Sequence, residues 1–96
     1  MIQSFGDETP ADLFRERNTR AARKITREPW RAAQRKLKAL DAAERLTDLA
    51  IPSCNRLELL RGDQMGRHSV RIKDRYRITF RWDGGHAYEV RIENYH

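Results

Sequence analysis

The end of the sequence carries side chains that can transfer a proton beside side chains that can bind a phosphate. Asn94-Tyr95-His96 follows a strand-like segment over residues 88–93, and the His96 imidazole titrates near neutral pH. Upstream, Arg75-Tyr76-Arg77-Ile78-Thr79-Phe80-Arg81 has the alternation of a strand whose polar face is mostly arginine. Arginines directed at an imidazole suit chemistry on a phosphodiester, and we expect RNA to supply it.

The other candidate reactive groups favour simpler interpretations. From spacing alone, the alternative that His96 is a frayed terminal residue without a role is favoured over a catalytic one. His68 and His86, at a strand start and beside a turn, are expected to be structural or exposed, and Cys54 is expected to be an incidental thiol. No group of His, Cys, Asp and Glu has the spacing of metal ligands, so we predict no metal and no cofactor.

Composition indicates a small, basic domain. The 96 residues, 39% of them apolar, supply one modest core, and we predict a single domain over residues 1–96. Twenty basic and fourteen acidic residues give a net charge of +6, which favours polyanionic partners. One cysteine excludes an internal disulfide, and neither a membrane span nor a signal peptide is evident, so the expected location is the cytoplasm.

Two helices are expected in the first half of the chain. Thr9-Pro10-Ala11-Asp12 predicts the start of a short helix that Leu13 and Phe14 anchor, and residues 18–25 are predicted to be mainly a connection. A longer helix is predicted to begin at Thr26. Its apolar stripe consists of Trp30, Ala33, Leu37 and Leu40. Four basic residues that lie largely off this stripe form either a solvated face or a polyanion-contacting surface; they are Arg27, Arg31, Arg35 and Lys38.

The second half alternates with a period of two, so the fold class is predicted to be α+β. Strands are expected over residues 56–60, 69–72, 76–82 and 88–93, with a short one at 1–5. Three-residue loops at 73–75 and 83–85 would give the pairs Val70–Ile78, Ile72–Tyr76, Phe80–Tyr88, Ile78–Val90 and Tyr76–Ile92.

That register would place three arginines, Arg71, Arg77 and Arg91, in one row across the sheet. Opposed like charges destabilise a sheet unless an anion offsets them. A bound phosphate would do so, and the internal alternative is the set Glu58, Glu89 and Glu93.

In order and spacing, these segments resemble the HigB toxins of bacterial toxin–antitoxin systems, within the RelE/ParE superfamily. The resemblance covers essentially the whole chain, from Met1-Ile2-Gln3-Ser4-Phe5 through Leu40-Asp41-Ala42-Ala43 to Tyr95-His96. It is densest in Arg56-Leu57, Leu60-Arg61-Gly62-Asp63, Gly66, Ser69-Val70 and Tyr76-Arg77-Ile78-Thr79-Phe80.

The resemblance implies a RelE-like fold, with two N-terminal helices packed on a small, mainly antiparallel sheet. It implies a toxin that enters the ribosomal A site, contacts ribosomal RNA and cleaves the mRNA, which inhibits translation. It also implies a HigA-type antitoxin with a helix-turn-helix, through which alone the toxin would reach operator DNA, and it implies no membrane partner.

Carried over by position, the family's catalytic Arg, Tyr and His fall on Arg77, Tyr95 and His96, and Arg61 matches a basic residue that supports the site. The sequence departs from the better-studied members at Glu58, where they have His, and at Asn94, where they have Asp.

Metal-independent RNA cleavage needs a base for the 2′-hydroxyl, an acid for the departing 5′-oxygen and positive charge at the phosphorus. We predict Glu58 as the base, His96 as the acid, Arg77 at the scissile phosphate and Tyr95 as a hydrogen-bonding or stacking group. The residues predicted to contact RNA are Arg61, Arg71, Arg91 and Asn94.

Two other functions remain open. One is a ParE-like inhibitor of DNA gyrase on the same fold without nuclease activity. Arg77, Tyr95 and His96 together argue against it, whereas Glu58 and Asn94 leave room for it. The other is a non-catalytic basic module that binds RNA or DNA, which the net charge supports equally.

Overall fold

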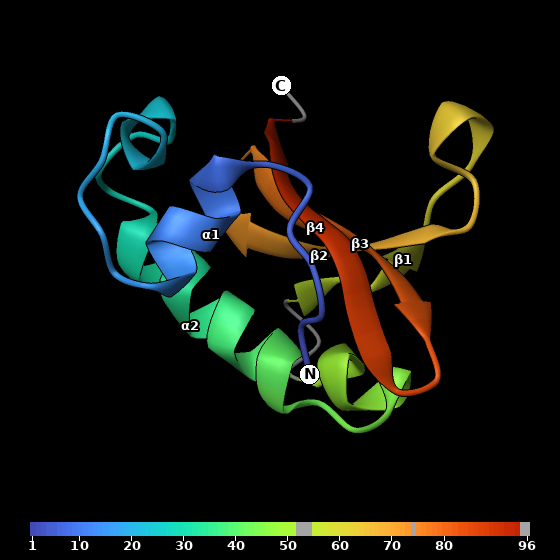
Figure 1. The fold of residues 1–96 in the computed structure, drawn as a ribbon. Helices are drawn as coiled ribbons and strands as arrows, with labels where there is room; N and C mark the ends of the chain where they lie inside the picture. Colours follow the sequence, from blue (N-terminus) through green and yellow to red (C-terminus); the bar gives the residue numbers. More distant parts are fainter. Residues whose placement is uncertain (52–54, 74, 95–96) are drawn as a thin grey trace.

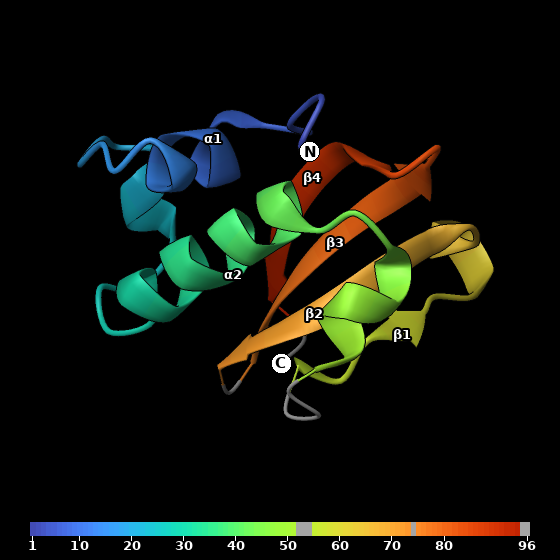
Figure 2. The same ribbon diagram turned by 90° about the horizontal axis from the view of Figure 1, so that it is seen from below.

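Two helices lie on one face of a four-stranded antiparallel sheet (Figures 1 and 2). The computed structural model describes residues 1–51, 55–73 and 75–94. The helices are α1 (Glu8–Phe14) and α2 (Trp30–Ala42), with single 3₁₀ turns η1 (Ala22–Lys24), η2 (Leu46–Ala50) and η4 (Gly62–Gln64). The strands are β1 (Glu58–Leu59), β2 (Arg67–Lys73), β3 (Tyr76–Asp83) and β4 (His86–Asn94), side by side in chain order. The predicted α+β class is confirmed.

The N-terminal segment runs along the outer edge of β4, as Figure 1 shows. Parallel bridges join Ile2 to Ala87 and Phe5 to Val90, so the short strand expected at residues 1–5 is reduced to two isolated bridges. None of the helices in the described ranges has the length and hydropathy of a membrane span.

Both helices begin at residues other than those predicted. Asp7, rather than Thr9, caps α1, and its carboxylate accepts a hydrogen bond from the Thr9 amide at 3.0 Å. Pro29 occupies the N-cap position of α2, so that helix starts later than the predicted Thr26. A proline ring fixes φ and lacks an amide hydrogen, so the boundary at Pro29 is physically reasonable.

The apolar stripe predicted for the long helix is confirmed. Trp30, Ala33, Leu37 and Leu40 are all buried, and α2 packs on β2 and β4 while α1 packs on α2 and β4. The indole Nε1 of Trp30 donates to the Ile25 carbonyl at 2.8 Å, which satisfies its polar group inside the core. The sheet contributes the buried side chains Val70, Ile72, Tyr76, Ile78, Phe80, Ala87 and Val90.

His68 is half-buried and packs against this core. Its ring stacks on Phe80 with the centroids 6.0 Å apart, and its Nδ1 is buried without a hydrogen-bond partner among the described residues. Burial in this apolar contact lowers the pKa of His68 below its usual 6.5, because charging the ring there would desolvate a cation.

Stability is therefore expected to fall on mild acidification. Above pH 6.5 the imidazole is neutral in both folded and unfolded chains, and below it the unfolded chain takes up the proton first. Urea unfolding at pH 7.5 and 5.5 should show a lower free energy of unfolding at the lower pH, and His68→Gln should flatten this dependence. An equal pH dependence in the variant would assign the effect to other groups.

The register between β2 and β3 is the predicted one over most of its length. Val70 lies opposite Ile78 and Arg71 opposite Arg77. A shift between Arg71 and Lys73 then places Lys73 opposite Tyr76, so the predicted Ile72–Tyr76 pair is wrong.

The predicted register between β3 and β4 is wrong, for two reasons. The turn between the strands holds two residues instead of three, Gly84 and Gly85, both at positive φ (58° and 82°). The shorter turn pairs Arg81 with Tyr88, so the Tyr88 side chain lies on the face opposite the helices. A bulge then sets two residues of β4 against Phe80, with Glu89 at φ 52°. Beyond the bulge, Ile78 pairs with Ile92.

The two changes add up to a shift of two residues, which keeps apolar partners on the same face. The consequence for the polar residues is large. Glu93, rather than Arg91, lies opposite Arg77, and Arg91 lies opposite Thr79. The predicted row of three arginines is therefore reduced to Arg71 and Arg77 with a glutamate beside them.

Candidate functional site: the polar face of the sheet

The face of the sheet opposite the helices carries four of the eight residues for which a role was predicted, and we call it the polar face. Three cross-strand rows build it. Their members, in order across the strands, are Arg71, Arg77 and Glu93; then Glu58, Ser69, Thr79 and Arg91; then Arg67, Arg81 and Tyr88. The Glu89 side chain joins the last row from the bulge, through ion pairs with Arg67 and Arg81.

Arg77 is held firmly in the first row. Its Nε donates to the Ser69 hydroxyl at 2.9 Å and its Nη2 to the Arg56 carbonyl at 2.6 Å. Only 12% of its side chain is exposed, so the guanidinium is positioned by the protein rather than by solvent. A cation fixed in this way requires little reorganisation when it meets a developing negative charge.

Glu58, the predicted base, lies beside Arg77, the residue predicted to bind the scissile phosphate. Its carboxylate is 3.8 Å from Arg77 Nη2, and 57% of its side chain is exposed. Because the carboxylate is largely in solvent, the pairing stabilises the fold little, and an incoming phosphate can compete with it for the same cation. The short strand β1 carries Glu58 toward Ser69, which explains how residues 19 positions apart meet at one site.

A hydrogen-bonded chain continues from this site into the sheet. The buried Thr79 hydroxyl donates to the Glu93 carboxylate and accepts from Arg67 Nη2 at 3.1 Å, and Gln64 Nε2 donates to Glu93 at 2.8 Å. Thr79 is fully buried and Arg67 is 8% exposed. Burial, followed by the neighbouring Arg91 charge, lowers the pKa of Arg67.

The residues predicted to contact RNA are spread more widely. Arg71 lies opposite Arg77 on the polar face, and Arg61 is exposed in the connection between β1 and β2. Arg91 points toward the N-terminal segment, where it covers Gly6; a β-carbon at Gly6 would lie 2.5 Å from Arg91 Cγ. Arg91 is therefore close to the polar site but outside the row that contains Arg77.

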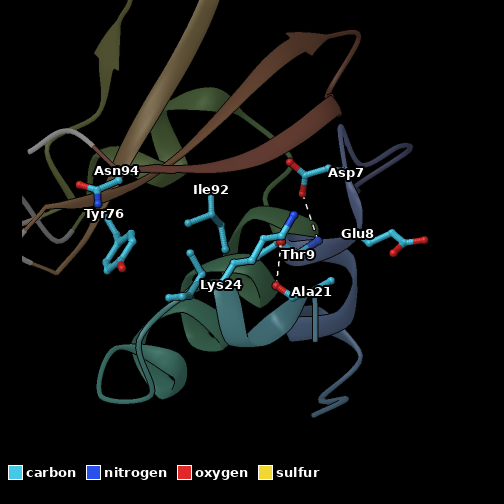
Figure 3. A pocket seen from close by; sticks show the side chains of 9 residues that line it. Asp7, Glu8, Thr9, Ala21, Lys24, Tyr76, Ile92 and Asn94 are labelled. Atoms are coloured by element: carbon cyan, nitrogen blue, oxygen red, sulfur yellow. Dashed lines mark hydrogen bonds between the residues drawn. The ribbon is translucent and has the colours of Figure 1, made fainter. Parts of the chain in front are cut away.

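Asn94 does not join Arg77. It pairs with Tyr76 and lines a cavity of about 500 Å³ on the helix side of the sheet (Figure 3). In that cavity the Thr9 hydroxyl donates to the Ala21 carbonyl, and Lys24 and Ile92 also line it. The predicted residues Tyr95 and His96, like Cys54, lie outside the described residues.

Several polar-face residues were absent from the sequence-based set. Arg67, Ser69 and Arg71 alternate along one strand, and this period of two was the signal that would have found Arg67 and Ser69. Tyr88 and Arg81 share a row only because of the two-residue turn, which the sequence alone left ambiguous. In the described ranges no three His, Cys, Asp or Glu side chains are grouped as metal ligands.

A comparison with models of known protein families identifies the family of this chain. The model of the family described as "RelE-like toxin of type II toxin-antitoxin system HigB" matches residues 3–96. The chain belongs to the HigB toxin family. This confirms the resemblance inferred from the order and spacing of the sequence segments.

Individual relatives agree with the HigB assignment. The chain is 42% identical over 59 residues to Toxin HigB-1 of Vibrio cholerae, a match over 62% of both chains. It is 34% identical over 61 residues to Endoribonuclease HigB of Proteus vulgaris, over 64% of this chain and 65% of the relative. In both cases the match spans less than two thirds of the relative's own length.

A solved structure supports the RelE-like fold of this HigB-family chain. The YoeB–YefM complex from Staphylococcus aureus superposes with a TM-score of 0.59 at 14% sequence identity, over 100% of this chain and 98% of the other. At this identity the likeness concerns the fold alone. The predicted fold, two helices on a small antiparallel sheet, is confirmed.

Proposed function

We propose that this HigB-family chain is an endoribonuclease that cleaves mRNA in the ribosomal A site and thereby inhibits translation. The observation that carries the proposal is the fixed Arg77 guanidinium beside the Glu58 carboxylate on the polar face. Membership of the HigB family, with a relative named Endoribonuclease HigB, supports the same reaction class.

The reaction needs no metal in this proposal. The 2′-hydroxyl attacks the phosphorus, Glu58 takes its proton, and Arg77 stabilises the charge that develops on the non-bridging oxygens. His96 protonates the departing 5′-oxygen, and Tyr95 hydrogen-bonds or stacks on a base. Arg61, Arg71, Arg91 and Asn94 complete the contacts to RNA, with Asn94 reaching it from the helix side of the sheet.

The proposed partners follow from the same function. A HigA-type antitoxin with a helix-turn-helix neutralises the toxin in the cytoplasm and connects it to operator DNA, while the ribosome presents the mRNA. Support for an antitoxin comes from the family, described as part of a type II toxin–antitoxin system, and from a fold neighbour solved as the YoeB–YefM complex.

Two substitutions test the assignment of acid and base. We expect His96→Ala and Glu58→Gln each to lower the toxin's cleavage of mRNA on purified ribosomes about 10²- to 10⁴-fold, because each substitution removes one proton-transfer group. The readout is the 5′ ends of mRNA after induced expression and in the purified assay.

Different outcomes separate the roles. Cleavage unchanged in Glu58→Gln but lost in His96→Ala would reduce Glu58 to an ion-pair partner of Arg77. Intact messages with arrested DNA supercoiling in the wild type would contradict the nuclease and favour the gyrase inhibitor.

A further inference from the structure

A second pair of opposed arginines lies on the polar face, away from Arg77. Arg67 and Arg81 are direct cross-strand partners in β2 and β3, an arrangement that destabilises a sheet unless an anion lies between them. In this structure the anion is the Glu89 carboxylate, 3.9 Å from Arg67 Nη1 and 3.4 Å from Arg81 Nη2. The other pair of opposed arginines, Arg71 and Arg77, differs in this respect, because Glu58 forms an ion pair with Arg77 from a neighbouring row.

The chain holds Glu89 in an unusual backbone conformation to place it there. Its φ is 52°, a left-handed value that is uncommon for a non-glycine residue and occurs often at functional sites. Its amide donates to the Ser4 hydroxyl at 2.9 Å, and its carbonyl accepts from Arg67 Nη2 at 2.7 Å. The bulge is thus fixed from both sides, and the carboxylate is directed at the two arginines.

The two arginines differ in a way that suits anion binding. Arg67 is a rigid cation: 10% of its side chain is exposed, and its Nε is buried without a partner among the described residues. Arg81 is half-exposed, at 49%, as is Glu89, at 50%. A half-exposed ion pair is weak and readily exchanged, so another anion from solvent can replace Glu89 at Arg81.

An aromatic ring completes the group. Tyr88 lies opposite Arg81 in β4, and the Arg81 guanidinium carbon is 5.3 Å from the centre of its ring. Single-stranded nucleic acids are commonly bound by this combination, in which a cation contacts the phosphate and an aromatic side chain stacks on a base.

The geometry points to a second nucleotide subsite, in which Arg81 and Arg67 bind an RNA phosphate, Tyr88 stacks on a base, and Glu89 is the internal anion that the RNA displaces. The subsite rests on the proposed function, which supplies RNA as the ligand. Arg77 and Arg81 are four residues apart on β3, about 13 Å at the usual strand rise, so the two phosphates are different ones on the same strand.

The test is the salt dependence of binding to a short, fluorescein-labelled single-stranded RNA, measured by fluorescence anisotropy on the full chain carrying His96→Ala. Loss of one phosphate contact should reduce the magnitude of the slope of the log association constant against log salt concentration by about 0.7. We therefore expect Arg81→Gln to lower the slope by that amount and to weaken binding about fivefold at roughly 0.1 M salt. Tyr88→Ala should weaken binding roughly tenfold with the slope unchanged.

Glu89→Gln is the distinguishing variant, because it removes the internal competitor while keeping the size of the side chain. It should strengthen RNA binding and steepen the slope. Matched controls for the two charge changes are Arg20→Gln, between α1 and η1, and Glu44→Gln after α2, both exposed and away from the polar face.

The subsite is wrong if Arg81→Gln leaves the slope unchanged, if Glu89→Gln weakens binding, or if the two control variants reproduce both effects. Thermal unfolding of each variant shows that it is folded, and Tyr88→Phe, which keeps the ring, should restore binding. Ribosome-dependent cleavage by the wild type is scored separately: its absence would refute the proposed function, while the slopes still decide whether the subsite exists.

Discussion

Arg77→Gln is expected to lower ribosome-dependent mRNA cleavage about 100- to 1,000-fold, the loss typical when one preorganised donor to a developing oxyanion is removed. The effect should be large because Arg77 is fixed by Ser69 and by the Arg56 carbonyl, so its charge is aligned before the phosphate arrives. Cleavage would be measured on purified ribosomes at saturating mRNA, so that the loss of activity appears in the cleavage rate of the toxin bound to its substrate.

Arg77→Lys separates charge from geometry. The ammonium keeps the positive charge but cannot bind Ser69 and the Arg56 carbonyl while also contacting a phosphate through a planar fork, so it should recover only a small part of the activity. Arg20→Gln, with the same charge change at an exposed position between α1 and η1, should cleave at the wild-type rate. Equal losses in Arg77→Gln and Arg20→Gln would contradict a specific role and indicate a general effect of net charge.

Phe80→Ala is expected to lower the free energy of unfolding by about 3–5 kcal/mol, the usual loss for a buried phenylalanine. Phe80 is fully buried at the centre of β3, where its ring contacts His68 and Trp82 at centroid distances of 6.0 and 6.3 Å. It also lies between His68 of β2 and the bulge that sets the register of β4, so its loss removes packing toward both neighbouring strands. Urea unfolding followed by circular dichroism measures the change.

Leu59→Ala is the matched control. Leu59 is 61% exposed on β1, so truncating it should change the free energy of unfolding by less than about 0.5 kcal/mol. A small loss in Phe80→Ala would mean that the core collapses around the missing ring. In that case its contacts would be replaceable, and the importance assigned to this position would be wrong.

On the polar face, the carboxylates that pair with the arginines are as important as the arginines themselves. Glu58 and Glu89 each neutralise a guanidinium that lies opposite another arginine. The sequence offered two alternatives for such residues, a bound phosphate or internal glutamates. The structure shows internal partners for the arginines. In the proposed subsite a phosphate replaces Glu89, whereas Glu58 stays beside Arg77 as the proposed base.

The order of elements followed from local patterns that need no long-range information. Spacings of three and four placed the buried face of α2 on Trp30, Ala33, Leu37 and Leu40, and alternation placed Ile78 and Phe80 inward on β3. The family was likewise inferred from the order and spacing of sequence segments, and the family model that matches residues 3–96 confirms it. The boundaries were less accurate, since Asp7 and Pro29 compete with neighbouring residues that are also suited to begin a helix.

The partners of each polar side chain required the tertiary structure. A two-residue turn and a bulge are each small local choices, yet together they exchanged Arg91 for Glu93 opposite Arg77 and brought Tyr88 to Arg81. Both registers keep apolar residues on the helix face beyond the bulge, so the hydrophobic pattern cannot distinguish them. The sequence by itself determined that arginines line one face of the sheet; only the folded chain decided which anion each of them meets.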